Sequence, residues 1–275
     1  MNHDAIRPPA VAGKFYPADP HKLQALVERY LNAAAAPDDC LDPPLVKAII
    51  APHAGYVYSG PIAASAYVHL ACSDVPIRRF VLIGPAHFVP VRGLATSSAR
   101  AFDTPLGRVR IDEVARAAIL SLPQVRVSDP AHEPEHCLEV QLPFLQSLFP
   151  DFTFVPLLVG HASARAVAEV LEQLWGGPET RIIVSSDLSH YYPQEIARRL
   201  DAETAESIVA LQPEALHEDA ACGQAAIGGL LLAAQARGMT AAVVDLRTSG
   251  DTGGPTDRVV GYGAFTFVER VPSIL

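Results

Sequence analysis

The sequence predicts an α/β protein, a layered fold in which helices flank a largely parallel or mixed central sheet. Apolar, β-branched runs alternate with segments of helical periodicity along the 275 residues. Three of these runs are continuously apolar, which is typical of central strands covered on both faces. No stretch resembles a linker and no solenoid repeat is found, so we expect a single domain over residues 1–275.

Strands are expected where apolar, β-branched residues run together. The six predicted strands cover residues 46–51, 80–84, 152–159, 181–185, 242–246 and 259–268. The first, second and fourth are the continuously apolar runs, so we place them at the centre of the sheet. A further short strand is expected after a turn in residues 103–109.

Helices are expected from periodicity and from capping residues. Asp19 and Asp112 are N-cap candidates, and Arg237-Gly238 is typical of a helix end. The seven predicted helices cover residues 20–35, 61–71, 113–122, 138–149, 163–175, 194–210 and 222–236.

Composition and charge limit the class of protein. Apolar residues are 49% of the chain and charged residues 19%, which indicates a folded core. The net charge of -9 disfavours nucleic acid or an anionic membrane as a partner. We see no signal peptide, and the most apolar stretch, 225–234, is too short to span a bilayer, so we expect a cytoplasmic protein. The four widely spaced cysteines are expected to be free thiols.

Potential metal ligands follow the predicted central strands. His53 follows the strand at 46–51, His87 follows the strand at 80–84, and Cys222 stands at a predicted helix start. Ligands bind where the carboxyl ends of parallel strands share an edge, and helix amides lower the pKa of a thiol. Two histidines and a thiolate suit a metal ion. The alternatives are histidines bonded to loop carbonyls and a buried, inert cysteine.

Asp187 and His190 share the loop after the strand at 181–185. A carboxylate near an imidazole fixes its tautomer and raises its basicity, as general base catalysis requires. The alternative is that Ser186 or Asp187 only caps the next helix. We therefore predict an acid–base pair beside the metal site, with helix capping as the competing interpretation.

Three further histidines compete for a place in this site. His136 opens a predicted helix and is expected to point into it. His132 is expected to be a solvated loop histidine, because Pro134 makes a continuous helix through both residues unfavourable. His161 follows a predicted strand and is a weaker rival candidate.

Several motifs, taken in order, point to one family. They are Pro52-His53-Ala54-Gly55-Tyr56-Val57-Tyr58-Ser59-Gly60, Gly84-Pro85-Ala86-His87, Glu135-His136-Cys137-Leu138-Glu139-Val140-Gln141-Leu142-Pro143, Ser185-Ser186-Asp187-Leu188-Ser189-His190, Cys222-Gly223 and Arg258-Val259-Val260-Gly261-Tyr262. From about Arg7 to the last strand the chain resembles the Memo family. Prokaryotic members of that family are known as AmmeMemoRadiSam system protein B, and the family is similar in fold to the class III extradiol dioxygenases.

The resemblance implies a metal held by His53, His87 and Cys222, with Asp187, His190 and His136 around it. Extradiol dioxygenases hold Fe(II) with two histidines and a carboxylate. Cys222 takes the place of that carboxylate here, so the resemblance does not extend to catechol cleavage. Iron follows from the relation to dioxygenases and copper from the soft thiolate ligand, while zinc also suits the donors.

Three functions are compatible with these residues. The first is a metal-dependent oxidoreductase, dioxygenase-like, acting on an unknown small molecule, in which His190 moves a proton, Asp187 orients it and His136 stabilises charge. The second is a hydrolase that uses zinc-activated water or a Cys222 nucleophile. The third is a non-catalytic metal-binding or adaptor component with AMMECR-like and radical-SAM protein partners. We favour the first.

Overall fold

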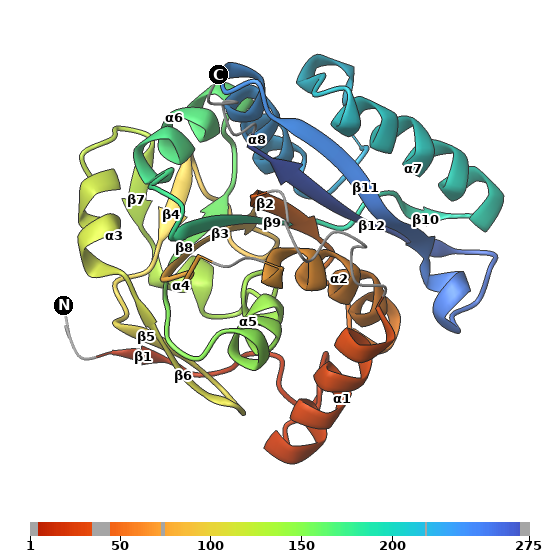
Figure 1. Cartoon of the computed structure of the whole chain (residues 1–275), viewed down its shortest axis with the longest axis horizontal. Coiled ribbons are helices and arrows are strands. Elements are labelled where there is room, and N and C mark those ends of the chain that lie inside the picture. Colours follow the sequence, from red (N-terminus) through yellow and green to blue (C-terminus); the bar gives the residue numbers. More distant parts are fainter. Residues whose placement is uncertain (1–4, 35–44, 73–74, 218, 270–275) are drawn as a thin grey trace.

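A mixed β-sheet forms the middle layer of the protein, and helices cover both of its faces (Figure 1). The architecture comes from a computed structural model that describes residues 5–34, 45–72, 75–217 and 219–269. Central strands alternate their side chains between two apolar cores. Ile49 and Leu82 belong to one core, and Ile50 and Ile83 belong to the other. The predicted α/β class and the largely parallel centre of the sheet are confirmed.

The sheet has a parallel centre, to which both parallel and antiparallel strand pairs are added. Four parallel neighbours, in the order β8, β3, β9 and β2, lie at its middle. On the other side of β2, β12 runs antiparallel and pairs with β10 and β11, while β4 joins β8 to β7. The strands are β1 (Ile6–Arg7), β2 (Val46–Ala51), β3 (Arg79–Pro85), β4 (Leu94–Thr96), β5 (Ala101–Thr104), β6 (Gly107–Ile111), β7 (Val125–Val127), β8 (Thr153–Val159), β9 (Thr180–Ser185), β10 (His190–Tyr192), β11 (Thr240–Thr248) and β12 (Val259–Val268).

The helices divide between the two faces. Side chains of α1, α2 and α5 pack into the core that contains Ile49, and those of α3, α6, α7 and α8 pack into the core that contains Ile50. The helices are α1 (Pro20–Ala33), α2 (Tyr56–Ala71), α3 (Glu113–Ile119), α4 (Asp129–His132), α5 (Leu142–Leu148), α6 (Ala164–Leu174), α7 (Gln194–Val209) and α8 (Gln224–Ala236). Among the described residues, no helix combines the length and apolarity that crossing a bilayer requires.

Two helices differ from the predicted bounds for reasons of proline chemistry and packing. Helix α2 begins at Tyr56, before Pro61, because burial of its apolar face outweighs the backbone hydrogen bond that proline removes. The predicted helix 138–149 is divided into a 3₁₀ turn, Glu139–Gln141, and α5, whose first turn contains Pro143. The segment 103–109 contains the end of β5, a turn and the start of β6, so the short strand expected after a turn is confirmed.

The cysteine prediction is partly wrong. Cys137 and Cys222 are free, but Cys72 is disulfide-bonded. Sequence spacing does not reveal which distant thiols approach one another, which is why this bond was missed. Cys40 lies outside the described residues.

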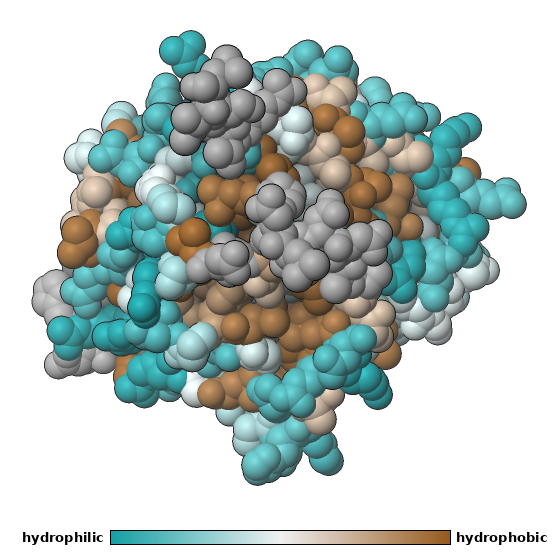
Figure 2. All heavy atoms as spheres, viewed as in Figure 1, coloured by the Kyte–Doolittle hydropathy of each residue, from teal (hydrophilic) through white to brown (hydrophobic). Residues whose placement is uncertain are grey.

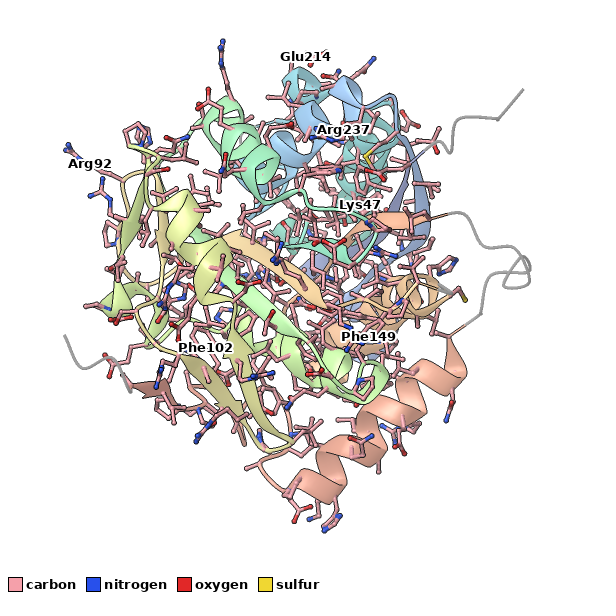
Figure 3. All side chains as sticks on the ribbon, turned by 60° about the vertical axis from the view of Figure 1, so that its left-hand side comes forward. Lys47, Arg92, Phe102, Phe149, Glu214 and Arg237 are labelled. Carbon is pink, nitrogen blue, oxygen red and sulfur yellow. The ribbon has the colours of Figure 1, made fainter. Side chains whose placement is uncertain are left out.

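Two cations, the buried Lys47 and the half-buried Arg237, lie at the amino-terminal edge of the central strands. The Lys47 Nζ of β2 donates to the carbonyls of Gly177 and Thr180, at 2.8 and 3.0 Å. Lys47 and Arg237 both lie over the ring of Trp175, at 5.6 and 3.9 Å from its centroid, and Figure 3 labels both residues. Burial lowers the pKa of Lys47 to about 8.

On the face drawn in Figure 2, apolar residues gather at the centre and hydrophilic residues lie at the rim.

Candidate functional site

The chain segments that follow β2, β3 and β9 converge at the carboxyl edge of the sheet. These strands are adjacent in the order β3, β9, β2, and all three run parallel. His53 follows β2, His87 follows β3, and Asp187 follows β9. Parallel neighbours deliver such side chains to one edge, so the sequence-based placement of these three residues is confirmed.

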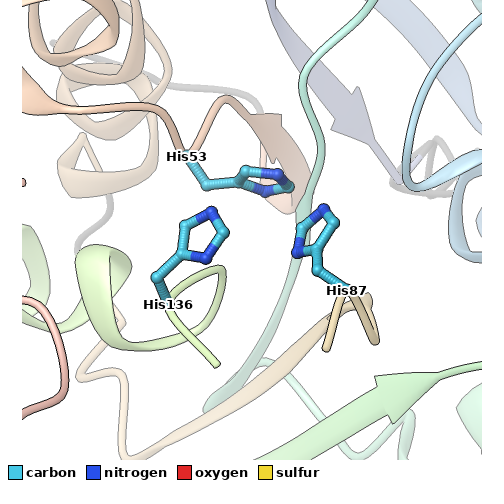
Figure 4. A group of neighbouring side chains, drawn as sticks. All are labelled: His53, His87 and His136. Carbon is cyan, nitrogen blue, oxygen red and sulfur yellow. The ribbon is translucent and has the colours of Figure 1, made fainter. Parts of the chain in front are cut away.

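Three imidazoles form the centre of the site. His53, His87 and His136 each offer a donor atom, and these atoms lie within 4.8 Å of one another. Their ring centroids are 4.9 to 5.4 Å apart, and Figure 4 shows the rings facing a common space from three different segments. Phe15 packs on the ring of His136, with ring centroids 4.6 Å apart. His136 therefore points into the site, as expected.

Cys222 contacts one of these histidines. Its Sγ lies 3.3 Å from His53 Nε2 and also accepts a hydrogen bond from the Asp187 backbone N–H at 3.3 Å. Two donors at roughly 2.0 and 2.3 Å from one tetrahedral ion are separated by about 3.5 Å, so this nitrogen and sulfur can share a metal. Cys222 is not part of the group whose donors all lie within 4.8 Å. The ligand set of His53, His87 and Cys222 stays a prediction.

The expected effect of helix amides on Cys222 is not observed. Helix α8 begins at Gln224 with Gly223 as its N-cap, so the thiol stands just before the helix. Burial and the charge of Asp187 raise the pKa of Cys222 to about 12, and the neighbouring N–H groups only partly offset this. Burial of the sulfur beside a carboxylate thus outweighs the helix terminus, and a bound cation would be needed to favour the thiolate.

Asp187 is buried and anchors the loop that carries His53. Its Oδ1 accepts from the His53 backbone N–H at 2.7 Å, and its Oδ2 lies 4.0 Å from His53 Nε2. Burial raises the pKa of Asp187, and this outweighs the hydrogen bond from His53. His190 opens β10 and is half-buried, and it acts on Asp187 through charge rather than through a hydrogen bond. The predicted orientation of His190 by Asp187 stays a prediction.

Two glycines allow these segments to approach one another. A Cβ at Gly84 in β3 would lie 2.9 Å from Cys137 Sγ, so only glycine leaves room for the segment that carries His136. A Cβ at Gly223 would lie 2.7 Å from the Ser186 side chain. Glycine there lets Cys222 reach the loop after β9, and Gly223 N donates to Ser186 Oγ at 2.9 Å.

Glu135 is a buried component of the site that the sequence-based reasoning missed. Its carboxylate accepts from the His87 ring Nδ1 at 2.9 Å, from the His87 backbone N–H at 2.7 Å and from the N–H groups of His136 and Cys137. Burial alone would raise the pKa of Glu135, but these hydrogen bonds, above all from His87, hold it at about 2. The Glu135-His136 pair in the sequence was the available signal, but it does not show the contact with His87.

A second buried chain of hydrogen bonds was also missed. His53 Nδ1 lies 2.9 Å from Ser185 Oγ at the end of β9. Gln141 Nε2 donates to that same oxygen at 2.9 Å and to the Pro52 carbonyl at 3.0 Å. Tyr67 on α2 donates to Gln141 Oε1 at 2.8 Å. No local motif signals this chain, because it joins four distant segments.

The remaining histidines lie outside the site. His132 is 2% exposed and its Nε2 lies 3.1 Å from the Ala95 carbonyl, so the expectation of a solvated loop histidine is wrong. Its segment forms the short helix α4, which packs under β4. His161 is exposed in an isolated bridge with Arg92 and does not line the cavity of the site.

The imidazoles open on a cavity of about 540 Å³, which is lined by aromatic, imidazole and apolar side chains together with Asp187 and Cys222. A second hollow of about 510 Å³ adjoins it and shares His190 and Cys222. The Nδ1 of His136 is buried without a hydrogen-bond partner and lies 3.2 Å from Glu135 Oε1 outside hydrogen-bonding geometry. The fit to a metal ion comes from the convergence of the three imidazoles, with the Cys222 thiol against His53.

A second group of donors is structural. His87, Glu135 and Cys137 also lie close enough to hold an ion. However, the carboxylate of Glu135 is already occupied by N–H donors, and the Cys137 thiol donates to the Pro85 carbonyl at 3.2 Å. This group therefore braces the site rather than forming a second one.

Comparison with known proteins agrees with these motifs. A family model described as Memo-like protein matches residues 7–266. A MEMO1 family protein of Ignicoccus hospitalis is 38% identical, with 95% of this chain and 98% of that protein covered. MEMO1 family proteins of Methanopyrus kandleri and Nitrosopumilus maritimus are 36% and 31% identical, with 95% and 96% of this chain and 98% and 100% of each relative covered. The chain belongs to the Memo family.

Proposed function

We propose that this chain is a non-haem metal-dependent oxidoreductase, dioxygenase-like in its chemistry, that acts on an unknown small molecule. In this proposal His53, His87 and Cys222 hold iron or copper, with zinc as the alternative metal. The observation that carries the proposal is the convergence of three histidines and a thiol on one cavity. A bound iron or copper ion would act as a redox-active Lewis acid with an open ligand position.

Two of the imidazoles are in the protonation state that a metal needs. Burial, together with the neighbouring His87, lowers the pKa of His53 to about 3. Burial also lowers the pKa of His136, to about 4. Both rings are therefore neutral near pH 7 and have a lone pair to donate.

The acid–base roles fall to the groups around the cavity. His190 is half-buried at the wall, and we assign to it the transfer of a proton to or from the substrate. Asp187 lines the same cavity, and we assign to it the orientation of that ring. His136, which stacks on His87 and packs against the tilted ring of Phe15, is placed to stabilise charge that develops on the substrate.

Two other functions have less support. A Cys222 nucleophile with His190 as its base would need the thiol to face that ring, but the sulfur contacts His53 instead. A non-catalytic metal-binding component would use the same metal ligands, and AMMECR-like and radical-SAM proteins are its proposed partners. Exposed aromatic side chains beside the cavity, Phe88 at 56% and Tyr191 at 61%, favour such contacts.

Oxygen consumption tests this proposal. Protein loaded with iron(II) or with copper(I), with ascorbate as the reductant, is compared with His190→Gln and with the exposed control His161→Gln. We expect oxygen uptake that is reduced by about 10²-fold or more in His190→Gln and unchanged in the control. Metal binding without oxygen uptake in the wild type would favour the non-catalytic component.

A further inference from the structure

We propose that Ser185 with Gln141, and separately Glu135, are positioning residues that fix the tautomers of His53 and His87. Both rings then carry their proton on Nδ1 and present an unprotonated Nε2 to the cavity. The inference rests on the proposed metal site, because it explains how two ligands are prepared before a metal arrives. It follows from counting donors and acceptors in the two buried hydrogen-bond chains.

The chain behind His53 allows only one arrangement of protons. The Pro52 carbonyl can only accept, so the Gln141 amide nitrogen must face it, at 3.0 Å. The other amide proton then points at Ser185 Oγ, and the amide oxygen accepts from Tyr67. The orientation of this amide is therefore set by its neighbours.

The single hydroxyl proton of Ser185 is already used in a hydrogen bond. Its Oγ lies 2.6 Å from the Cys137 carbonyl, which can only accept. Ser185 must therefore accept at its two remaining contacts, from Gln141 and from His53 Nδ1. His53 consequently holds its proton on Nδ1, which leaves Nε2 free on the side that faces Cys222 Sγ at 3.3 Å.

The carboxylate of Glu135 imposes the same tautomer on His87. Three backbone N–H groups, of His87, His136 and Cys137, donate to its two oxygens and stabilise the ionised form. An ionised carboxylate can only accept, so the His87 Nδ1 at 2.9 Å must donate to it. Glu135 therefore orients His87 as a carboxylate orients a metal-binding imidazole.

Nitrogen NMR of the histidine rings tests the inference in metal-free protein. Long-range ¹H–¹⁵N spectra of ¹⁵N-histidine-labelled protein distinguish protonated from unprotonated ring nitrogens. We expect protonated Nδ1 in His53 and His87, and in His69, whose Nδ1 lies 2.8 Å from the Ser65 carbonyl. His132 is the internal contrast, since its Nε2 faces a carbonyl and must carry the proton. Wild-type protein with Nε2 protonated in His53 or His87 would overturn the inference.

Two variants separate positioning from folding. In Ser185→Ala we expect His53 to lose its single tautomer while His87 keeps its own, and in Glu135→Gln we expect the reverse. The undisturbed histidine in each variant reports that the protein is folded, and Tyr67→Phe should alter neither ring because Pro52 still orients Gln141. Unchanged tautomers in both variants would contradict the assignment.

Metal affinity provides a second readout. Titration with zinc(II) alone should show about 10- to 100-fold weaker binding in Ser185→Ala and in Glu135→Gln than in the wild type. Unchanged affinity in both variants would contradict the positioning role. Failure of the proposed oxidoreductase function would leave the tautomers and zinc affinity as expected, so the two proposals can fail separately.

Discussion

Arg7 is predicted to hold the amino-terminal segment against the site. Its side chain is 5% exposed and pairs with the fully buried Glu139 at 2.7 Å. It also donates to the carbonyls of His132 and Glu135, which flank the segment that leads to His136. The substitution Arg7→Met would leave a buried carboxylate without its cation and would remove the Arg7 hydrogen bonds to both carbonyls, of which that of His132 keeps its bond from the Glu135 backbone N–H.

Removing one partner of a buried ion pair costs about 3–5 kcal/mol of unfolding free energy, and we expect a loss in this range. The matched control is Arg78→Met, whose pair with Asp151 is exposed at 61% and 67% and is worth about 0–1 kcal/mol. Urea unfolding of the three proteins at pH 7 measures the difference. A loss in Arg7→Met no larger than that in Arg78→Met would refute the reasoning.

Three further predictions concern buried groups. Burial raises the pKa of Asp201 to about 6, so its protonated carboxyl stabilises the fold below pH 4, and this stabilisation is lost as pH rises through 6. Asp201→Asn should therefore abolish a decline in unfolding free energy on the order of 2–3 kcal/mol over this range. The same pH dependence of unfolding free energy in wild type and variant would contradict this. The pKa of Lys47 is lowered to about 8, so between pH 8 and 10.5 the unfolded chain binds more protons than the folded chain. The unfolding free energy of the wild type should therefore rise relative to that of Lys47→Met by on the order of 3 kcal/mol in that window. Thermal unfolding that shows no relative rise would refute this prediction. A Cβ at Gly261 would lie 1.9 Å from Asp201 Oδ2, so Gly261→Ala should cost about 1–3 kcal/mol in urea unfolding, and wild-type stability would disprove the clash.

The fold was predictable from the sequence where burial is continuous. The strands at 46–51 and 181–185 are fully buried, and their uninterrupted apolar runs locate β2 and β9 to within one residue. The strands β1, β4, β7 and β10 were missed because each has only two or three residues, too few to show a period.

Part of the site was predictable for the same reason. His53 and His87 follow central strands, and the rule for parallel sheets brings them together without any coordinates. Glu135 and Ser185 were missed because their partners lie 48 and 132 residues away in the chain. The pKa of Cys222 was predicted in the wrong direction because a helix start is visible in the sequence, but the burial of the sulfur beside Asp187 is not.

The central claim is that this edge of the sheet holds a metal through His53, His87 and Cys222. Elemental analysis of protein purified without oxygen tests it most directly, with His53→Ala, Cys222→Ser and the exposed control His161→Ala measured in parallel. We predict stoichiometric iron or copper in the wild type and the control, and its loss in both site variants. A wild type without metal even after reconstitution, or a metal content unchanged by His53→Ala, would contradict the claim.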